Sequence, residues 1–176
     1  MFKKNNNILV GKIYQNIIEI SRSKFFYLDY EVEDNFEARF DLITLHAFII
    51  FYYYKYIGIN KSLFSQSLFD LMFEDFENNL REMGFGDIAV NKKMKAFILA
   101  FYGRIAQYSK GLDLYFNNDD KELLEQTILN NIYKGKVVKK IYSKNFAEYM
   151  KNNIEHFSIA SESVNIEKNF DFLKFY

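Results

Sequence analysis

The stretch NFEARFDLITLHAFIIFYYYKYI, residues 35–57, decides the fold of this chain. From Phe36 to Ile57 apolar residues recur at alternating steps of four and three, which is the spacing of one face of an α-helix. Further apolar residues cover most of the remaining helix surface. A helix that is apolar on nearly all sides is typical of the middle of a helical bundle. Asp34 or Asn35 can cap its first turn with a side-chain oxygen.

The sequence on both sides of this segment also has a helical pattern. The chain has no proline and only seven glycines, and both residue types interrupt helices. Apolar stripes with helical spacing, bounded by capping residues, predict five further helices. These cover residues 7–20, 62–83, 91–115, 119–133 and 143–157. Residues 158–176 have no helical period, and we expect them to pack as an extended strap.

These patterns predict an all-α fold, namely a single-domain bundle of about six helices with an extended C-terminal strap. A length of 176 residues is enough for one domain with a sizeable core. Residues 1–34 are interpreted as an N-terminal helix and connector, and residues 35–176 as the main helical domain. Neither an internal repeat nor a linker indicates a second domain.

The charge of the chain is balanced overall but is arranged in blocks. Lys and Arg together number 23, as do Asp and Glu. This balance argues against DNA as a partner, because nucleic-acid binding depends on neutralising many phosphates. Residues 29–37 and 70–87 are acidic, whereas residues 92–95 and 134–144 are basic. Such blocks are suited to electrostatic complementarity, either with a partner or with one another within the bundle.

No segment of the sequence indicates a membrane span or an oxidised thiol. The longest apolar run, residues 42–59, contains His46, Lys55 and four tyrosines, and falls short of about 20 clean apolar residues. The N-terminus lacks the apolar core of a signal peptide. Cysteine is absent, which excludes thiolate catalysis and cysteine-ligated metals. We therefore expect a cytoplasmic protein, and peripheral contact with a membrane surface stays open.

The segment LREMGFGDIAVNKKMKAFILAFYGRIAQY, residues 80–108, contains a glycine-rich corner between two predicted helices. Gly84 is predicted to end the first helix, and Asp87 to fix the turn. Gly103 costs about 1 kcal/mol inside a helix, so we expect close helix packing there to compensate. Arg104 could then pair with Asp87 or Glu82 across that contact. We predict that Arg81, Asp87 and Arg104 lie close together.

Three lysines are the candidate partner-binding residues. Lys92, Lys93 and Lys95 fall at the predicted start of a helix, where the helix dipole disfavours cations. Cations in an unfavourable position indicate an acidic partner or an anionic surface. An ordinary solvated surface is the alternative interpretation.

No set of residues in the sequence has the spacing of a catalytic or metal site. His46 is interpreted as a buried, hydrogen-bonded histidine, with haem binding as the alternative. Asp70, Glu74 and Asp75 are similar to the acidic helices of prenyl-diphosphate enzymes, but a second set of matching spacing is missing. No catalytic residue, metal or cofactor is therefore expected, and a haem- or isoprenoid-binding protein is the alternative function.

Four segments of the chain together resemble the ubiquinol–cytochrome c chaperone family. They are Ala38-Arg39-Phe40-Asp41-Leu42 with His46, then Leu68-Phe69-Asp70, then Leu80-Arg81-Glu82 with Gly84, Gly86 and Asp87, and finally Phe101-Tyr102-Gly103-Arg104 with Tyr108. The resemblance spans about residues 35 to 172. It marks eleven motif residues as structural: Arg39, Asp41, His46, Arg81, Glu82, Gly84, Gly86, Asp87, Gly103, Arg104 and Tyr108.

The resemblance implies a helical protein without enzymatic activity that helps to assemble the cytochrome bc1 complex. Mitochondrial relatives hold newly made cytochrome b near the ribosomal exit, together with a small partner protein. Cytochrome b or a bc1 assembly intermediate is therefore the implied partner, and a ribosome or a small partner protein is a further candidate. The implied location is the cytoplasm or the periphery of the inner membrane.

Overall fold

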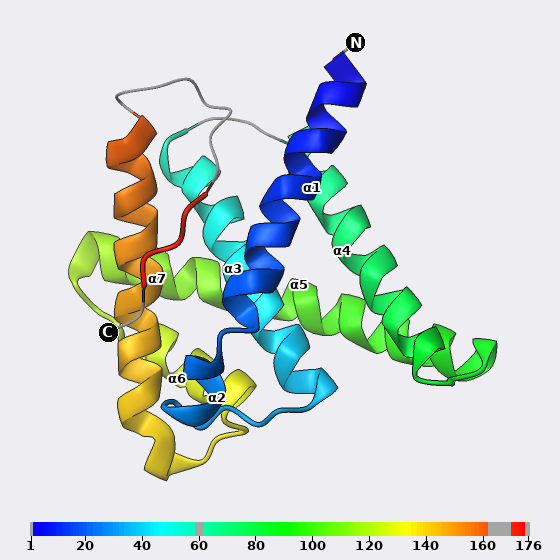
Figure 1. Cartoon of the computed structure of the whole chain (residues 1–176). Helices are drawn as coiled ribbons and strands as arrows, with labels where there is room; N and C mark the ends of the chain where they lie inside the picture. The colour runs from blue at the N-terminus through cyan, green and yellow to red at the C-terminus, as the bar shows by residue number, and fades with distance from the viewer. Residues whose placement is uncertain (1, 59–61, 162–169, 175–176) are drawn as a thin grey trace.

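The computed structural model describes residues 2–58, 62–161 and 170–174, and all regular structure in this part is helical (Figure 1). In chain order the elements are α1 (Phe2–Ser21), α2 (Lys24–Leu28), α3 (Phe36–Tyr56), α4 (Ser62–Glu82), α5 (Asp87–Asn118), α6 (Glu122–Ile132), the 3-10 helix η1 (Val137–Lys139) and α7 (Lys140–Ser161). The predicted all-α class is confirmed. The short helix α2, inside the predicted connector 21–34, was not foreseen.

Helix α3 lies at the centre of the bundle, as predicted (Figure 1). It packs against α1, α5, α6 and α7, and α4 packs against α1 and α5. Most residues of α3 are buried, including polar Asp41, Thr44 and His46. Its N-cap is Asn35, whose Oδ1 accepts a hydrogen bond of 2.8 Å from the Ala38 amide. The predicted cap is therefore confirmed.

The corner between α4 and α5 is shorter than predicted. Gly84 has a φ of +87°, a left-handed conformation that suits a glycine after a helix. Helix α5 begins at Asp87, so the predicted start at residue 91 is wrong. Gly86 occupies the N-cap position with extended backbone, and Asp87 places an acidic group in the first turn, where the helix dipole favours it.

The close approach between helices occurs at Gly111 and not at Gly103. A Cβ at Gly111 would lie 2.9 Å from the Leu124 Cα, so this glycine allows α5 and α6 to cross closely. No atom lies within 4 Å of the Cβ position at Gly103, which is exposed. The expectation that Gly103 mediates helix packing is therefore wrong.

The acidic and basic blocks near the two ends of the sequence meet in space. Lys136 Nζ lies 2.7 Å from Glu33, and Lys139 pairs with Glu31. The Tyr133 hydroxyl donates a 3.0 Å hydrogen bond to the Tyr30 carbonyl in the same region. The charge blocks 29–37 and 134–144 therefore match each other within the bundle.

The C-terminal segment 170–174 packs without helical structure along α3 and α7. The buried ring of Phe170 lies 5.5 Å from that of Tyr53 and 4.9 Å from that of Phe157. The Leu173 amide donates a 2.9 Å hydrogen bond to Asn153 Oδ1. The extended strap is confirmed for these five residues, while 162–169 and 175–176 lie outside the described residues.

Across the described ranges, none of the helices is both long enough and apolar enough to cross a membrane.

Candidate functional site

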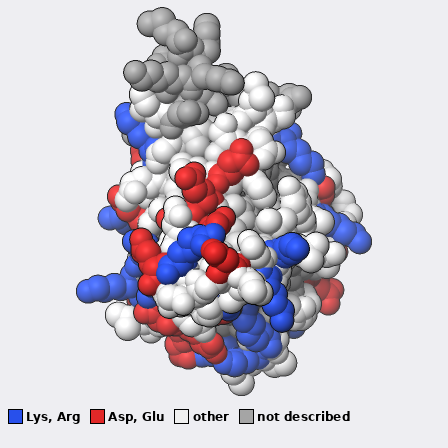
Figure 2. Space-filling model, turned by 90° about the vertical axis from the view of Figure 1, so that its right-hand side faces the viewer, with Lys and Arg blue, Asp and Glu red and all other residues white. Residues whose placement is uncertain are grey.

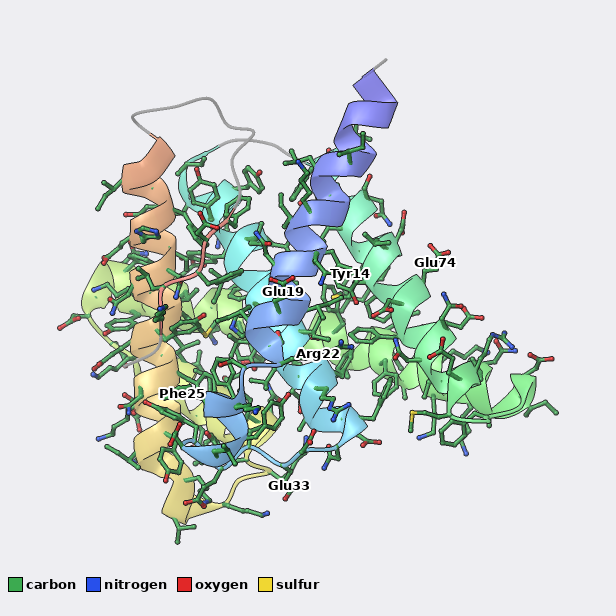
Figure 3. The ribbon with its side chains drawn as sticks, viewed as in Figure 1. Tyr14, Glu19, Arg22, Phe25, Glu33 and Glu74 are labelled. Carbon is green, nitrogen blue, oxygen red and sulfur yellow. The ribbon has the colours of Figure 1, made fainter. Side chains whose placement is uncertain are left out.

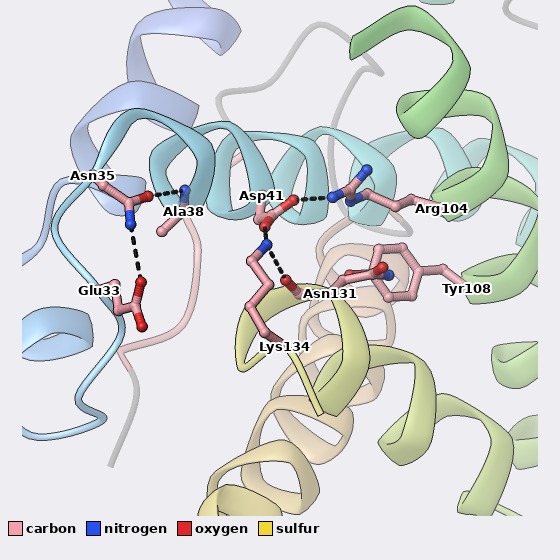
Figure 4. Close-up of polar contacts among 8 residues, drawn as sticks. All are labelled: Glu33, Asn35, Ala38, Asp41, Arg104, Tyr108, Asn131 and Lys134. Carbon is pink, nitrogen blue, oxygen red and sulfur yellow. Dashed lines mark hydrogen bonds and ion pairs between the residues drawn. The ribbon is translucent and has the colours of Figure 1, made fainter. Parts of the chain in front are cut away.

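A buried ion cluster joins three parts of the bundle (Figure 4). Asp41 on α3 has no exposed side-chain surface. Its Oδ1 lies 2.5 Å from an Nη of Arg104 on α5, and its Oδ2 lies 2.9 Å from Nζ of Lys134, just after α6. The guanidinium of Arg104 also lies 5.2 Å from the ring centre of Phe40. One carboxylate thus pairs with two cations from segments distant in sequence, one on α5 and one in the turn after α6.

Burial raises the pKa of Asp41 above its usual range, and the neighbouring Arg104 and Lys134 lower it in part. The cations therefore offset some of the cost of removing the carboxylate from water. Lys134 also donates to the Asn131 carbonyl at 2.8 Å, and Asn131 donates to the Tyr108 hydroxyl at 3.4 Å. Tyr108 is fully buried, which is consistent with its expected structural role.

The predicted cluster of Arg81, Asp87 and Arg104 is only partly present. Arg81 lies 2.5 Å from Asp87 and 2.8 Å from Glu77, so that pair is confirmed. Arg104 does not join it. Because Asp87 and Arg104 belong to the same helix, 17 residues place them roughly 25 Å apart along its axis. The alternative pairing of Arg104 with Glu82 is also wrong, since Arg104 pairs with Asp41.

The pairing of Asp41 with Arg104 is not predicted from the sequence, because Asp41 is treated there only as part of a family motif. An aspartate between Phe40 and Leu42 in an otherwise apolar helix must be buried, and a buried carboxylate needs a cation. That argument points to an internal base, which the structure identifies as Arg104. Lys134, in the basic connector, carried no individual sequence signal.

His46 occupies a closed, fully hydrogen-bonded position. Its Nδ1 lies 2.7 Å from the Leu42 carbonyl and 3.0 Å from the Ser21 hydroxyl, and its Nε2 lies 3.2 Å from the Tyr149 hydroxyl. Since a carbonyl only accepts, Nδ1 carries the proton and Nε2 accepts from Tyr149. Burial lowers the pKa of His46 to about 4. This arrangement leaves neither nitrogen available to haem iron.

The acidic residues of α4 do not face a second acidic set. Glu74 is exposed and points away from the bundle (Figure 3). Asp75 accepts a 2.7 Å hydrogen bond from the Tyr14 hydroxyl on α1, and Asp70 accepts one from Gln66. Within the described ranges, no group of three or more His, Asp or Glu residues is arranged to hold a metal ion. A magnesium-dependent prenyl site therefore has no support there.

The candidate lysines lie on the second and third turns of α5, because the helix starts earlier than predicted. The dipole argument for them consequently does not apply, since it holds only within the first turn. Lys92 and Lys95 are exposed, whereas Lys93 is half-buried with its Nζ 4.9 Å from the ring centre of Phe85. Figure 2 shows the side of the molecule that carries this corner, with basic and acidic side chains next to one another.

Two of these lysines belong to a continuous exposed row, which we call the α5 stripe. Its members follow one another at helical steps of four and three and therefore share one face: Ile88, Lys92, Lys95, Leu99 and Tyr102. The exposed fractions of Ile88, Leu99 and Tyr102 are 88%, 75% and 56%. Exposed Gly103 adjoins the row. Apolar and basic groups along one uncovered helix face are typical of a binding surface.

The remaining motif residues have local roles. Arg39 is exposed and lies 2.7 Å from Asp34, and Glu82 is exposed at the end of α4. Gly84 and Gly86 bound the corner that allows the chain to reverse from α4 into α5. These positions shape the surface from which the α5 stripe starts.

Comparison with known proteins identifies the family of this chain and a solved structure with a similar fold. A family model described as ubiquinol-cytochrome C chaperone matches residues 28–172. The chain belongs to the ubiquinol–cytochrome c chaperone family. A crystal structure of the Cbp3 homolog from Brucella abortus is similar, with 26% sequence identity and a TM-score of 0.71, covering 98% of this chain and 95% of that one. No curated protein matches the sequence. The family match includes both the buried ion cluster and the α5 stripe.

Proposed function

We propose that this protein is an assembly chaperone for the respiratory cytochrome bc1 complex and that it binds newly made cytochrome b or an assembly intermediate. The observation that carries the proposal is the family match over residues 28–172. The similarity to the Cbp3 homolog over nearly the full length supports it. The protein acts by binding and not by catalysis, in the cytoplasm or at the inner membrane. A ribosome or a small partner protein is a further candidate partner.

The α5 stripe, together with Lys93, is the proposed docking surface. Its exposed Ile88 and Leu99 offer apolar contact, and Lys92 and Lys95 offer two positive charges along about 20 Å of helix. A membrane-protein intermediate presents apolar segments flanked by charged ends, which fits such a mixed row. Gly103 beside Tyr102 has no side chain of its own, so a partner's backbone can approach α5 closely there.

Gene deletion tests the function. We expect the deletion strain to contain less assembled cytochrome bc1 complex, measured by native gel electrophoresis and haem b absorbance, while other respiratory complexes stay near their normal levels. Normal bc1 levels in that strain would overturn the assembly role.

Charge reversal tests the docking surface separately. The variant K92E/K93E/K95E is expected to co-purify with less cytochrome b and to rescue the deletion poorly. Its matched control, K12E/K24E/K110E, makes the same change of charge at other lysines and should rescue normally. Binding through exposed lysines also weakens as salt rises, because the screening length is about 8 Å at physiological ionic strength. Equal rescue by the two variants would exclude the α5 lysines but leave the assembly role intact.

An apolar variant completes this test. Ile88 and Leu99 contribute little to the core, so I88N/L99N should keep the stability of the wild type within about 1 kcal/mol. We expect this variant to lose cytochrome b in the same co-purification. Retained co-purification would show that the client does not contact this face.

A further inference from the structure

We propose that the segment from Lys134 to Lys144 is a membrane-docking tip that binds the surface of an anionic lipid bilayer. The segment contains η1 and the first turn of α7. This proposal goes beyond the proposed function, because it assigns a second surface, remote in sequence from the α5 stripe, to a partner other than the client protein.

Three aliphatic side chains project from this tip. Val137, Val138 and Ile141 have exposed fractions of 74%, 83% and 59%. They come from consecutive turns of helical backbone, so they lie next to one another. Exposed Leu28 belongs to α2, which lies at the same end of the bundle as the start of α7 (Figure 1). An aliphatic cluster at one end of a molecule can enter the boundary between lipid headgroups and acyl chains.

Lysines surround these aliphatic side chains. Lys136 and Lys139 are paired with Glu33 and Glu31, which fixes the tip against the preceding connector. Lys140 and Lys144 are exposed, and in the described part of the chain no carboxylate lies within 4.0 Å of their amino groups. The tip thus carries uncompensated positive charge beside its apolar cluster.

An anionic bilayer is the partner that this combination fits. Lipid headgroups supply phosphate charge for Lys140 and Lys144, and the adjoining acyl region accepts the aliphatic side chains without a complementary shape. The surrounding acids, Glu31 and Glu33, are already engaged with lysines and so do not repel anionic lipid strongly.

Vesicle flotation tests the proposal with the full-length protein. We expect binding to mixed phosphatidylglycerol–phosphatidylcholine vesicles, no binding to pure phosphatidylcholine, and weaker binding at high salt. The variants V137N/V138N/I141N and K140E/K144E should each reduce the partition coefficient ~10-fold or more. The matched controls I8N/L63N/I159N and K12E/K110E alter exposed groups elsewhere and should float like the wild type.

A spectroscopic readout keeps an apolar side chain at every position of the tip's aliphatic cluster. The chain has no tryptophan, so V138W introduces a single reporter. Its fluorescence should shift to the blue when anionic vesicles are added, whereas L63W, at an equally exposed site, should not shift. No flotation of the wild type, unaltered binding by both tip variants, or an unshifted V138W spectrum would each overturn the proposal. These results are independent of the bc1 level in the deletion strain, so the two proposals fail separately.

Discussion

Asp41 is the residue on which α3, α5 and the end of α6 converge. Replacing it with alanine leaves Arg104, whose side chain is only 14% exposed, without a counter-ion. Removing one partner of a buried pair costs about 3–5 kcal/mol, because the remaining charge stays out of water. We therefore expect D41A to lower the free energy of unfolding by that amount in urea titrations.

The control for D41A lies two residues earlier on the same helix. Arg39 pairs with Asp34 on the surface, where both side chains are more than half exposed. R39A should cost less than about 1 kcal/mol, since exposed ion pairs contribute little. A D41A loss as small as that of R39A would contradict a structural role for the buried cluster.

His46 makes the stability of the protein depend on pH. Its pKa is lowered from 6.5 to about 4 by burial, so the folded state binds fewer protons than the unfolded state between these values. The stability contributed by neutral His46 is therefore present above pH 6.5 and is lost as the pH falls toward 4. The full effect is on the order of 3 kcal/mol.

The variant H46Q isolates this effect from the other titrating groups. It should show a smaller loss of unfolding free energy than the wild type between pH 6.5 and pH 4, when both are measured by urea denaturation at a series of pH values. Parallel curves for the two proteins would show that His46 does not titrate as its burial requires.

At the scale of the helices, alanine substitutions at the two glycines of α5 are expected to have opposite effects on stability. G111A places a methyl group 2.9 Å from the backbone of α6, which must move away, at a cost of about 1–3 kcal/mol. G103A meets no neighbour and replaces a poor helix former, so it should stabilise the protein by about 0.5–1 kcal/mol. Thermal unfolding of G111A and G103A measures the direction of both changes in stability. Destabilisation by G103A would contradict the open geometry at that position.

The helix pattern predicted most elements because apolar periodicity reports the buried face directly. It failed where local chemistry competes with periodicity. The pattern predicts a start of α5 at Asn91, a good capping residue, although Gly86 supplies the cap and the helix begins four residues before Asn91 with Asp87, an acid that the helix dipole favours. Helix α2 has five residues, too few to establish a period.

Pairings between helices were less accessible to the sequence than the helices themselves. The pair Arg81–Asp87 was predictable because the corner brings them together locally. Arg104 was assigned to that corner because the orientation of α5 was unknown, and its contact with Asp41 spans 63 positions. The sequence likewise contained no indication that Gly111 rather than Gly103 lies at a helix crossing.

For the whole molecule, the strap of residues 170–174 closes one end of the core. Phe170 is 7% exposed and contacts rings on α3 and α7. F170A should lower the unfolding free energy by about 3–4 kcal/mol, because it leaves a cavity among aromatic side chains. The exposed neighbour Lys174 provides the control, as K174A should change stability by less than about 0.5 kcal/mol. Equal urea midpoints for the two variants would show that the strap is not part of the core.

The balanced net charge of the chain conceals the arrangement of its charges. The acidic block 29–37 and the basic block 134–144 were each consistent with an external partner, and the structure shows that Lys136 and Lys139 of the basic block pair with Glu33 and Glu31 of the acidic block. Only a fold can distinguish these cases, because the two blocks are about 100 residues apart in the sequence.

The central position of α3 also has a consequence for the timing of synthesis. The ribosome completes this helix at residue 56, when α1 and α2 have been made but α5, α6 and α7 have not. The last of its helical neighbours, α7, ends about a hundred residues later, which corresponds to roughly 5–20 s of translation at about 5–20 residues per second. During that interval the apolar surface of α3 lacks the later helices that cover it in the folded protein. We therefore expect the yield of this protein in a cell to fall when its second half is translated more slowly.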